Sequence, residues 1–280
     1  MTRRSFVPAL TGAVSLAAAA QEAKVNYRPG KLKQAICPGA LGRKMSLEDK
    51  CKEIARLGLY GIDLLGPKDW PTLLKYGLTP TLSTGGMSIR DGVNKVENHS
   101  AIETRFRELV DQCAASKVPN IIALSGERKG QPIEKGIENC VTFFNKVKAQ
   151  LEDKNVTVVM EYLNSKVNHP DYDFDHMKYG VEVCKRVNSP RVKILYDMYH
   201  VQIMEGDIIR TMKDNLQYIG HLHTAGNPGR HEMDDTQEMN YRGIAIQIAA
   251  MGYSGFVSHE YSPVRDAVKS LEETLKIFDV

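Results

Sequence analysis

Short apolar runs rich in β-branched residues alternate with longer amphipathic segments along most of this chain. The runs have the length and composition of buried strands, and the segments between them have the 3.6-residue period of helices. Strands that alternate with helices pair in parallel through crossover helices. The predicted strands cover residues 32–37, 61–65, 79–83, 120–126, 157–162, 192–197, 219–226 and 255–261.

Eight strand–helix units are the number that closes a (β/α)8 TIM barrel. Helices are predicted over residues 46–58, 101–117, 134–153 and 240–252. The first of these begins at Ser46 and ends at Gly58, residue types that favour the two ends of a helix. An open doubly wound sheet is the alternative, but no G-x-G-x-x-G motif follows an early strand. The sequence therefore predicts an α/β fold of the (β/α)8 barrel type.

The first twenty residues, "MTRRSFVPALTGAVSLAAAA", have a different character from the rest. Two arginines precede a short apolar run and an alanine-rich end, which is the order of a secretory signal. The "TRRSF" stretch indicates the twin-arginine route, and the apolar run is too short for a good membrane span. We therefore expect a signal peptide at residues 1–20, a single barrel domain at residues 21–280 and a periplasmic location. The alternative is that residues 1–20 form an N-terminal helix of the mature fold.

Composition excludes several classes of protein. The net charge is +3 and basic residues are not concentrated in one segment, so no nucleic-acid partner is expected. The five cysteines are singly placed without a C-x-x-C pair, which favours small buried side chains over a disulfide framework or zinc knuckle. The sequence does not determine whether the protein forms a homo-oligomer.

Ionisable residues follow four consecutive predicted strands, at the end of the barrel where (β/α)8 proteins carry their chemistry. These residues are Glu161, Asp197, His223 and Glu260. Three carboxylates buried together require a compensating cation. Three carboxylates and one imidazole suit one divalent ion, either Mn²⁺, Mg²⁺ or Co²⁺, with Zn²⁺ as an alternative.

Neighbouring polar residues are given other roles. Asp197 on its own could simply cap the helix that follows it. His200 lies just past Asp197, in a predicted loop where a substrate hydroxyl would rest. Pro228 and Gly229 predict a turn that would present Arg230 over the barrel mouth, although a solvated loop is the alternative.

Two further histidines are predicted to lie outside the ligand set. His221 alternates onto the same side as His223 but lies two residues deeper, which predicts a supporting or core role. His259 should face away from Glu260, toward the helices.

Several longer stretches resemble the hydroxypyruvate isomerase group of the xylose isomerase-like barrels, which also include ketose 3-epimerases. The stretches are "GIDLLGPKDWPTLLKYGL", "MEYLNSKVNHPDY", "LYDMYHVQIMEGD", "IGHLHTAGNPGRHEMDDTQEMNY" and "GFVSHEY". The resemblance runs from about residue 31 to the C-terminus. It places the metal ligands on the same four strand-end residues and implies that Glu161 and Glu260 are catalytic. It matches His200 and Arg230 to substrate-binding residues.

The resemblance implies an isomerase that acts on a small keto acid or sugar by proton transfer beside a carbonyl, through a metal-bound enediolate. Histidine at position 223 is typical of the ketose epimerases, whereas hydroxypyruvate isomerase tends to have glutamine there. Three alternatives remain: a periplasmic metal-dependent lyase or hydrolase acting on oxidised sugars, a non-catalytic sugar-binding module, and an apurinic endonuclease. The last would need a zinc cluster with more strand-end histidines and a basic surface facing DNA.

Overall fold

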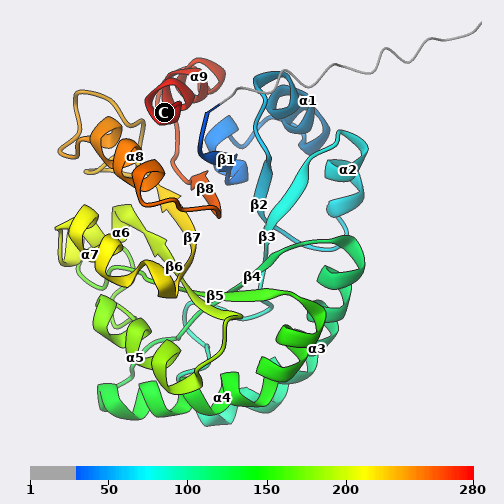
Figure 1. Ribbon diagram of the computed structural model, residues 1–280, viewed down its shortest axis with the longest axis vertical. Helices are drawn as coiled ribbons and strands as arrows, with labels where there is room; N and C mark the ends of the chain where they lie inside the picture. Colours follow the sequence, from blue (N-terminus) through cyan, green and yellow to red (C-terminus); the bar gives the residue numbers. More distant parts are fainter. Residues whose placement is uncertain (1–29) are drawn as a thin grey trace, which may run out of the picture.

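The computed structural model describes residues 30–280, so the predicted signal at residues 1–20 lies outside the described residues. Eight parallel strands form one closed barrel, in which every strand pairs with its sequence neighbours and β1 pairs with β8 (Figure 1). The predicted (β/α)8 barrel is therefore confirmed. The strands are β1 (Lys33–Ile36), β2 (Gly61–Leu65), β3 (Thr79–Ser83), β4 (Asn120–Ala123), β5 (Thr157–Glu161), β6 (Val192–Asp197), β7 (Ile219–Thr224) and β8 (Phe256–His259).

Helices surround the barrel and bury their apolar faces against it (Figure 1). They are α1 (Leu47–Leu57), α2 (Trp70–Lys75), α3 (Val96–Ser116), α4 (Ile133–Lys154), α5 (Met177–Val187), α6 (Met198–Met204), α7 (Ile208–Asn215), α8 (Tyr241–Ala250) and α9 (Ala267–Phe278). Two short 3₁₀ turns accompany them, η1 (Pro38–Leu41) and η2 (Leu216–Tyr218). The helix predicted over residues 101–117 begins earlier, at Val96. The predicted loop after Asp197 is wrong, because helix α6 begins there at once.

The ends of α1 follow the expected capping chemistry. Ser46 Oγ accepts a hydrogen bond from the Asp49 amide at 3.1 Å, which satisfies one of the free N–H groups of the first turn. Gly58 ends the helix with a φ of 75°, a conformation that glycine adopts without a steric cost.

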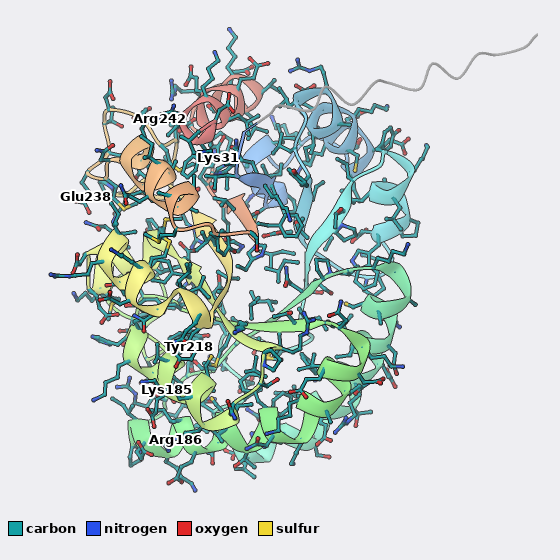
Figure 2. The ribbon with its side chains drawn as sticks, viewed as in Figure 1. Lys31, Lys185, Arg186, Tyr218, Glu238 and Arg242 are labelled. Carbon is teal, nitrogen blue, oxygen red and sulfur yellow. The ribbon has the colours of Figure 1, made fainter. Side chains whose placement is uncertain are left out.

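The two ends of the described chain are held against each other. The Lys31 amide donates to the Val280 carbonyl at 2.9 Å. Arg242 of α8 is labelled in Figure 2. Its Nη1 donates to the carbonyls of Lys276, Ile277 and Asp279 at the end of α9. These contacts satisfy carbonyls that a helix C-terminus leaves without a partner.

Strand β2 pairs irregularly with β3. The register shifts on both sides of Asp63, and Leu64 has a φ of 55°. A Cβ atom at Gly61 would lie 1.7 Å from the Thr79 carbonyl oxygen, so only glycine allows the two strands to approach this closely. The irregular strand carries the Asp63 side chain into the barrel, where the residue is fully buried.

All five cysteines are free and buried, as their spacing predicted. Among the helices of residues 30–280, none combines the length and the hydropathy needed to cross a membrane.

Candidate metal centre

Four strand ends bring their ionisable side chains together at one end of the barrel. Glu161 and Asp197 are the last residues of β5 and β6, His223 lies near the end of β7, and Glu260 follows β8. One ligand atom from each lies within 4.8 Å of the others. His223 Nδ1 is 2.7 Å from Glu260 Oε2, 3.6 Å from Glu161 Oε1 and 4.0 Å from Asp197 Oδ2. The residues predicted from strand ends thus form one cluster.

Three of the four cluster residues are buried. Asp197 and His223 are fully buried, whereas the Glu260 side chain retains 25% of its exposure. Burial raises the pKa of Glu161 to about 7, and the nearby Glu260 and Asp197 carboxylates push it in the same direction. Burial also raises the pKa of Asp197. Burial opposes ionisation of Glu260, but Arg230 and His223 hold its pKa below the usual range. Three carboxylates in this volume need positive charge to ionise together.

The chemistry of His223 fits a divalent cation at this cluster. Its Nε2 lies 3.0 Å from Asp63 Oδ2, a distance at which Nε2–H donates to the carboxylate. Burial opposes protonation of His223, but the neighbouring Glu260 and Asp63 raise its pKa well above the usual value, so Nδ1 also carries a proton. A cation at the cluster would replace this proton on Nδ1, the nitrogen that faces the three carboxylates. Among the described residues, buried Nδ1 has no hydrogen-bond partner of suitable geometry. A histidine held by a carboxylate on one nitrogen and free on the other is the usual arrangement of a metal ligand.

Asp63 contacts His223 of the cluster and was missed by the strand-end rule. Its Oδ2 accepts from His221 Nε2 at 2.6 Å as well as from His223, and Oδ1 accepts from Thr81 Oγ1. Burial opposes ionisation of Asp63, but His221 and His223 hold its pKa well below the usual range. His221 thus contacts the same Asp63 carboxylate as His223 and lies outside the group of four strand-end residues. The sequence signal that could have identified Asp63 is its position as a lone carboxylate inside the apolar run "GIDLL".

His259 faces the helices, as its alternation with Glu260 predicted. Its Nδ1 lies 2.8 Å from Thr224 Oγ1, and its Nε2 lies 3.0 Å from Gln34 Oε1. Its ring centroid is 4.9 Å from that of Phe278 in α9. Both nitrogens are occupied away from the cluster.

Arg230 reaches the cluster from the segment after β7. Its Nη2 donates to Asp197 Oδ2 at 2.9 Å and to Glu260 Oε2 at 2.7 Å. Gly229 and Arg230 both have positive φ angles, of 92° and 57°, in the turn that directs the guanidinium over the barrel mouth. The predicted position of Arg230 is therefore that seen in the structure.

His200 lies on α6, not in a loop as expected, and is fully buried. Asp197 Oδ1 accepts from the Tyr199 and His200 amides at 2.9 and 3.5 Å, so Asp197 caps this helix and also belongs to the cluster. Burial and the positive charge of Arg230 hold the pKa of His200 well below its usual value, so the ring is neutral.

The hydrogen bonds of His200 define a donor at the barrel mouth. The Asn164 amide donates to Nδ1 at 3.1 Å, which places the single ring proton on Nε2. Nε2 lies 2.8 Å from Arg230 Nη1, so two donors face each other. An oxygen lying to one side of this pair could accept from both donors. Asn164 was another functional residue missed from the sequence, because its role depends on a contact between separate segments.

A barrel with a carboxylate–imidazole cluster at the carboxyl ends of its strands belongs to the class of (β/α)8 proteins whose strand ends carry residues that could hold a cation. The model of the xylose isomerase-like TIM barrel family matches residues 73–279, and the chain belongs to this family.

Three known proteins show the range of similarity. The 2-oxo-tetronate isomerase of Cupriavidus necator is 35% identical over 127 residues, covering 45% of this chain and 46% of the relative. The hydroxypyruvate isomerase of Escherichia coli is 37% identical over 100 residues, covering 35% of this chain and 38% of the relative. The chain thus matches less than half the length of these relatives. A solved structure described as AP endonuclease, family 2, from Brucella melitensis has a TM-score of 0.76 and 27% identity, covering 88% of this chain and 99% of that one.

Proposed function

We propose that this protein is a divalent-metal-dependent isomerase or epimerase that moves a proton at the carbon beside the carbonyl of a small sugar or keto acid. The observation that carries the proposal is the convergence of Glu161, Asp197, His223 and Glu260, with His223 Nδ1 facing the three carboxylates at 2.7–4.0 Å. The isomerase names of the two curated relatives support the same reaction class.

A cation held by these four residues would polarise a substrate carbonyl as a Lewis acid. Each glutamate has two carboxylate oxygens, so one oxygen can hold the cation while the other takes up or returns the α-proton. Glu161 follows β5 and Glu260 follows β8, so the two carboxylates enter the site from different strands. An epimerase would use both glutamates, whereas an isomerase can use one as a shuttle.

His200 and Arg230 would orient the substrate. His200 Nε2–H and the Arg230 guanidinium face each other at 2.8 Å, and a substrate hydroxyl or carboxylate oxygen can accept from both donors. Arg230 also contacts Asp197 and Glu260, which places a bound oxygen beside the cluster.

The candidate ligand groups favour one cation over a multinuclear cluster. Within residues 30–280, three groups of His, Cys, Asp and Glu have metal-binding spacing, and all three contain His223. These groups contain only two histidines, His221 and His223, whereas a zinc-cluster endonuclease is expected to need more strand-end histidines.

The test combines metal analysis with solvent exchange. The purified protein, loaded with Mn²⁺, Mg²⁺ or Co²⁺, is incubated in heavy water with a panel of keto acids and ketoses, and NMR follows deuterium at the α-carbon. We expect one ion per chain and deuterium incorporation with at least one substrate. Sugar binding without exchange would favour a binding module, and an eliminated or hydrolysed product would favour the lyase or hydrolase alternative.

We further propose that residues 1–20 direct export of the folded protein by the twin-arginine route. The supporting observation is "TRRSF" followed by an apolar, alanine-rich run. Replacing Arg3 and Arg4 together with lysine should retain the protein in the cytoplasm, as measured by fractionation and immunoblotting. Unchanged export of the double variant would rule out this route. A matched Lys31→Arg variant, outside the signal, should be exported normally.

A further inference from the structure

Another imidazole lies at the barrel mouth, beside the proposed substrate-binding residues His200 and Arg230. It belongs to His169, in the segment between β5 and α5, and its ring centroid is 5.4 Å from that of His200. The residue is half-buried, and its ring nitrogens make no hydrogen bond to any other part of residues 30–280. Both nitrogens are therefore available to a ligand.

The backbone that carries His169 is fixed to the site. The His169 amide donates to the Asn164 carbonyl at 3.1 Å. The preceding residue, Asn168, accepts at Oδ1 from Asn164 Nδ2 at 2.8 Å and from the Tyr199 hydroxyl at 3.1 Å. The Asn164 amide also donates to His200 Nδ1 at 3.1 Å. The two imidazoles are thus positioned through one shared residue.

The surroundings of His169 keep its ring neutral. Arg230 lies on the same side of the site, with Cζ 5.0 Å from the ring centroid of Tyr199. Burial and the positive charge of Arg230 lower the pKa of His169, so the ring carries no charge near neutral pH. A neutral imidazole offers one N–H donor and one lone pair. A hydroxyl group can use both, whereas a carboxylate can use only the donor.

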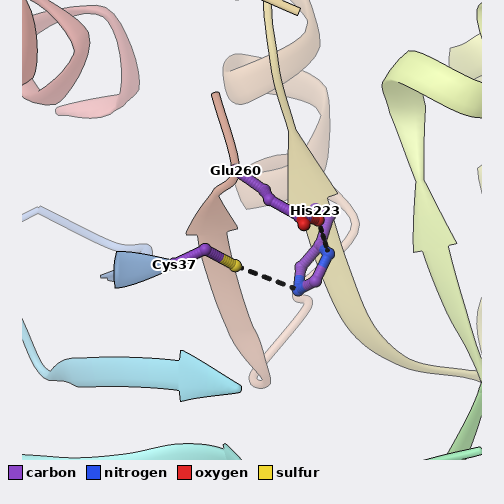
Figure 3. Close-up of side chains that lie close together, drawn as sticks. All are labelled: Cys37, His223 and Glu260. Atoms are coloured by element: carbon purple, nitrogen blue, oxygen red, sulfur yellow. Dashed lines mark hydrogen bonds and ion pairs between the residues drawn. The ribbon is translucent and has the colours of Figure 1, made fainter. Parts of the chain in front are cut away.

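The side chain that approaches the cluster from β1 is less suited to a hydroxyl. Cys37 follows β1 and is 3% exposed, and its Sγ lies 4.0 Å from His223 Nε2 (Figure 3). Burial raises the pKa of the Cys37 thiol, so the sulfur keeps its proton. A thiol is only a weak hydrogen-bonding group. His169 is therefore better placed than Cys37 to recognise a further hydroxyl of the substrate.

We propose that His169 is a specificity-determining residue that binds a hydroxyl group on the part of the substrate chain beyond the carbons between which the proton moves. The substrate class is then a ketose or keto acid with a hydroxylated chain longer than three carbons. This inference rests on the proposed function, because it places the reacting carbonyl at the four-residue cluster. His200 and Arg230 hold the nearer oxygen, and His169 holds the next one along the chain.

The experiment compares two ketoses on the full-length protein loaded with Mg²⁺. Dihydroxyacetone has a carbonyl and the two hydroxyls next to it, whereas D-ribulose carries further hydroxyls. Deuterium exchange at the α-carbon gives kcat/KM for each. His169→Phe keeps the ring contact with His200 but has no donor or lone pair. It should lower kcat/KM for D-ribulose by roughly 5–10-fold, the effect of one hydrogen bond, mainly through KM.

The same variant should leave kcat/KM for dihydroxyacetone and the metal content unchanged, which a loss of structure would not do. His169→Gln, which keeps a donor and an acceptor, should recover part of the D-ribulose activity. His176→Phe is the matched control, because His176 is an exposed histidine that pairs with Asp175. It should behave like the wild type. An equal loss for both ketoses in His169→Phe would overturn the inference.

A binding measurement separates this inference from the proposed reaction. Nitrogen NMR of protein labelled at histidine follows the ring of His169, whose signals are identified by their absence in His169→Phe. D-ribulose should shift these signals and dihydroxyacetone should not. No shift with D-ribulose would contradict the proposed contact. A shift without deuterium exchange into either ketose would support the contact while contradicting the proposed isomerase reaction.

Discussion

Replacing Glu161 or Glu260 with glutamine should lower turnover by roughly 10²–10⁴-fold, the usual contribution of general acid–base catalysis. Glutamine keeps an oxygen for the cation but cannot accept a proton at neutral pH. The cation should therefore remain bound, although less tightly, because one negative charge has been removed from the ligand set. Metal content and deuterium incorporation at the α-carbon are measured on the same samples.

The control for these variants is Glu182→Gln. Glu182 lies on α5, where it pairs with Arg186, and it takes no part in the cluster. Its replacement should leave metal content and exchange unchanged. If both Glu161→Gln and Glu260→Gln exchange the α-proton at the wild-type rate, the glutamates are not the catalytic acid and base.

Replacing Asp63 with alanine should weaken binding of the cation by roughly 10–100-fold, although Asp63 is not itself a proposed ligand. The change removes the acceptor of the His221 and His223 N–H groups. His223 can then rotate or carry its proton on Nδ1, the atom expected to bind the cation. Each donor left unsatisfied in the interior also costs about 1–3 kcal/mol, so the free energy of unfolding of the metal-free protein should fall.

Two further variants separate the contributions of Asp63. Asp63→Asn keeps an oxygen that can accept from both histidines, so its effect on Mn²⁺ binding should be smaller than that of Asp63→Ala. Thr81→Val removes only the hydrogen bond to Oδ1 and should leave Mn²⁺ affinity near the wild-type value. Affinity is read by electron paramagnetic resonance and stability by denaturant unfolding. Wild-type Mn²⁺ affinity in Asp63→Ala would contradict the supporting role.

The barrel was predictable because strand and helix patterns are local. Each strand of a (β/α)8 barrel is buried on both faces and reads as a short apolar run, and glycine or asparagine marks several helix ends. Closure of the parallel barrel places the carboxyl ends of all strands at the same end of the barrel. Residues such as Asp197 and Glu260 could therefore be assigned to one cluster without knowing any distance.

The missed residues depend on contacts between distant segments. Asp63 reaches His221 across 158 positions of the chain, and Cys37 reaches His223 across 186. The register shifts around Asp63 add an irregularity that simple alternation does not describe. His200 was placed in a loop because α6 is only seven residues long and follows β6 without a linker. Short helices carry too little periodicity to be recognised.

The capping bond of Asp197 has a mechanical consequence. The carboxylate that joins the cluster through Oδ2 also fixes the first turn of α6 through Oδ1, and that turn carries His200. Any ion that pulls on Asp197 therefore pulls on the helix that presents the substrate donor. If the proposed cation binds at Asp197, metal binding and the placing of His200 would be linked through this helix. We therefore expect the ion to bind before the substrate.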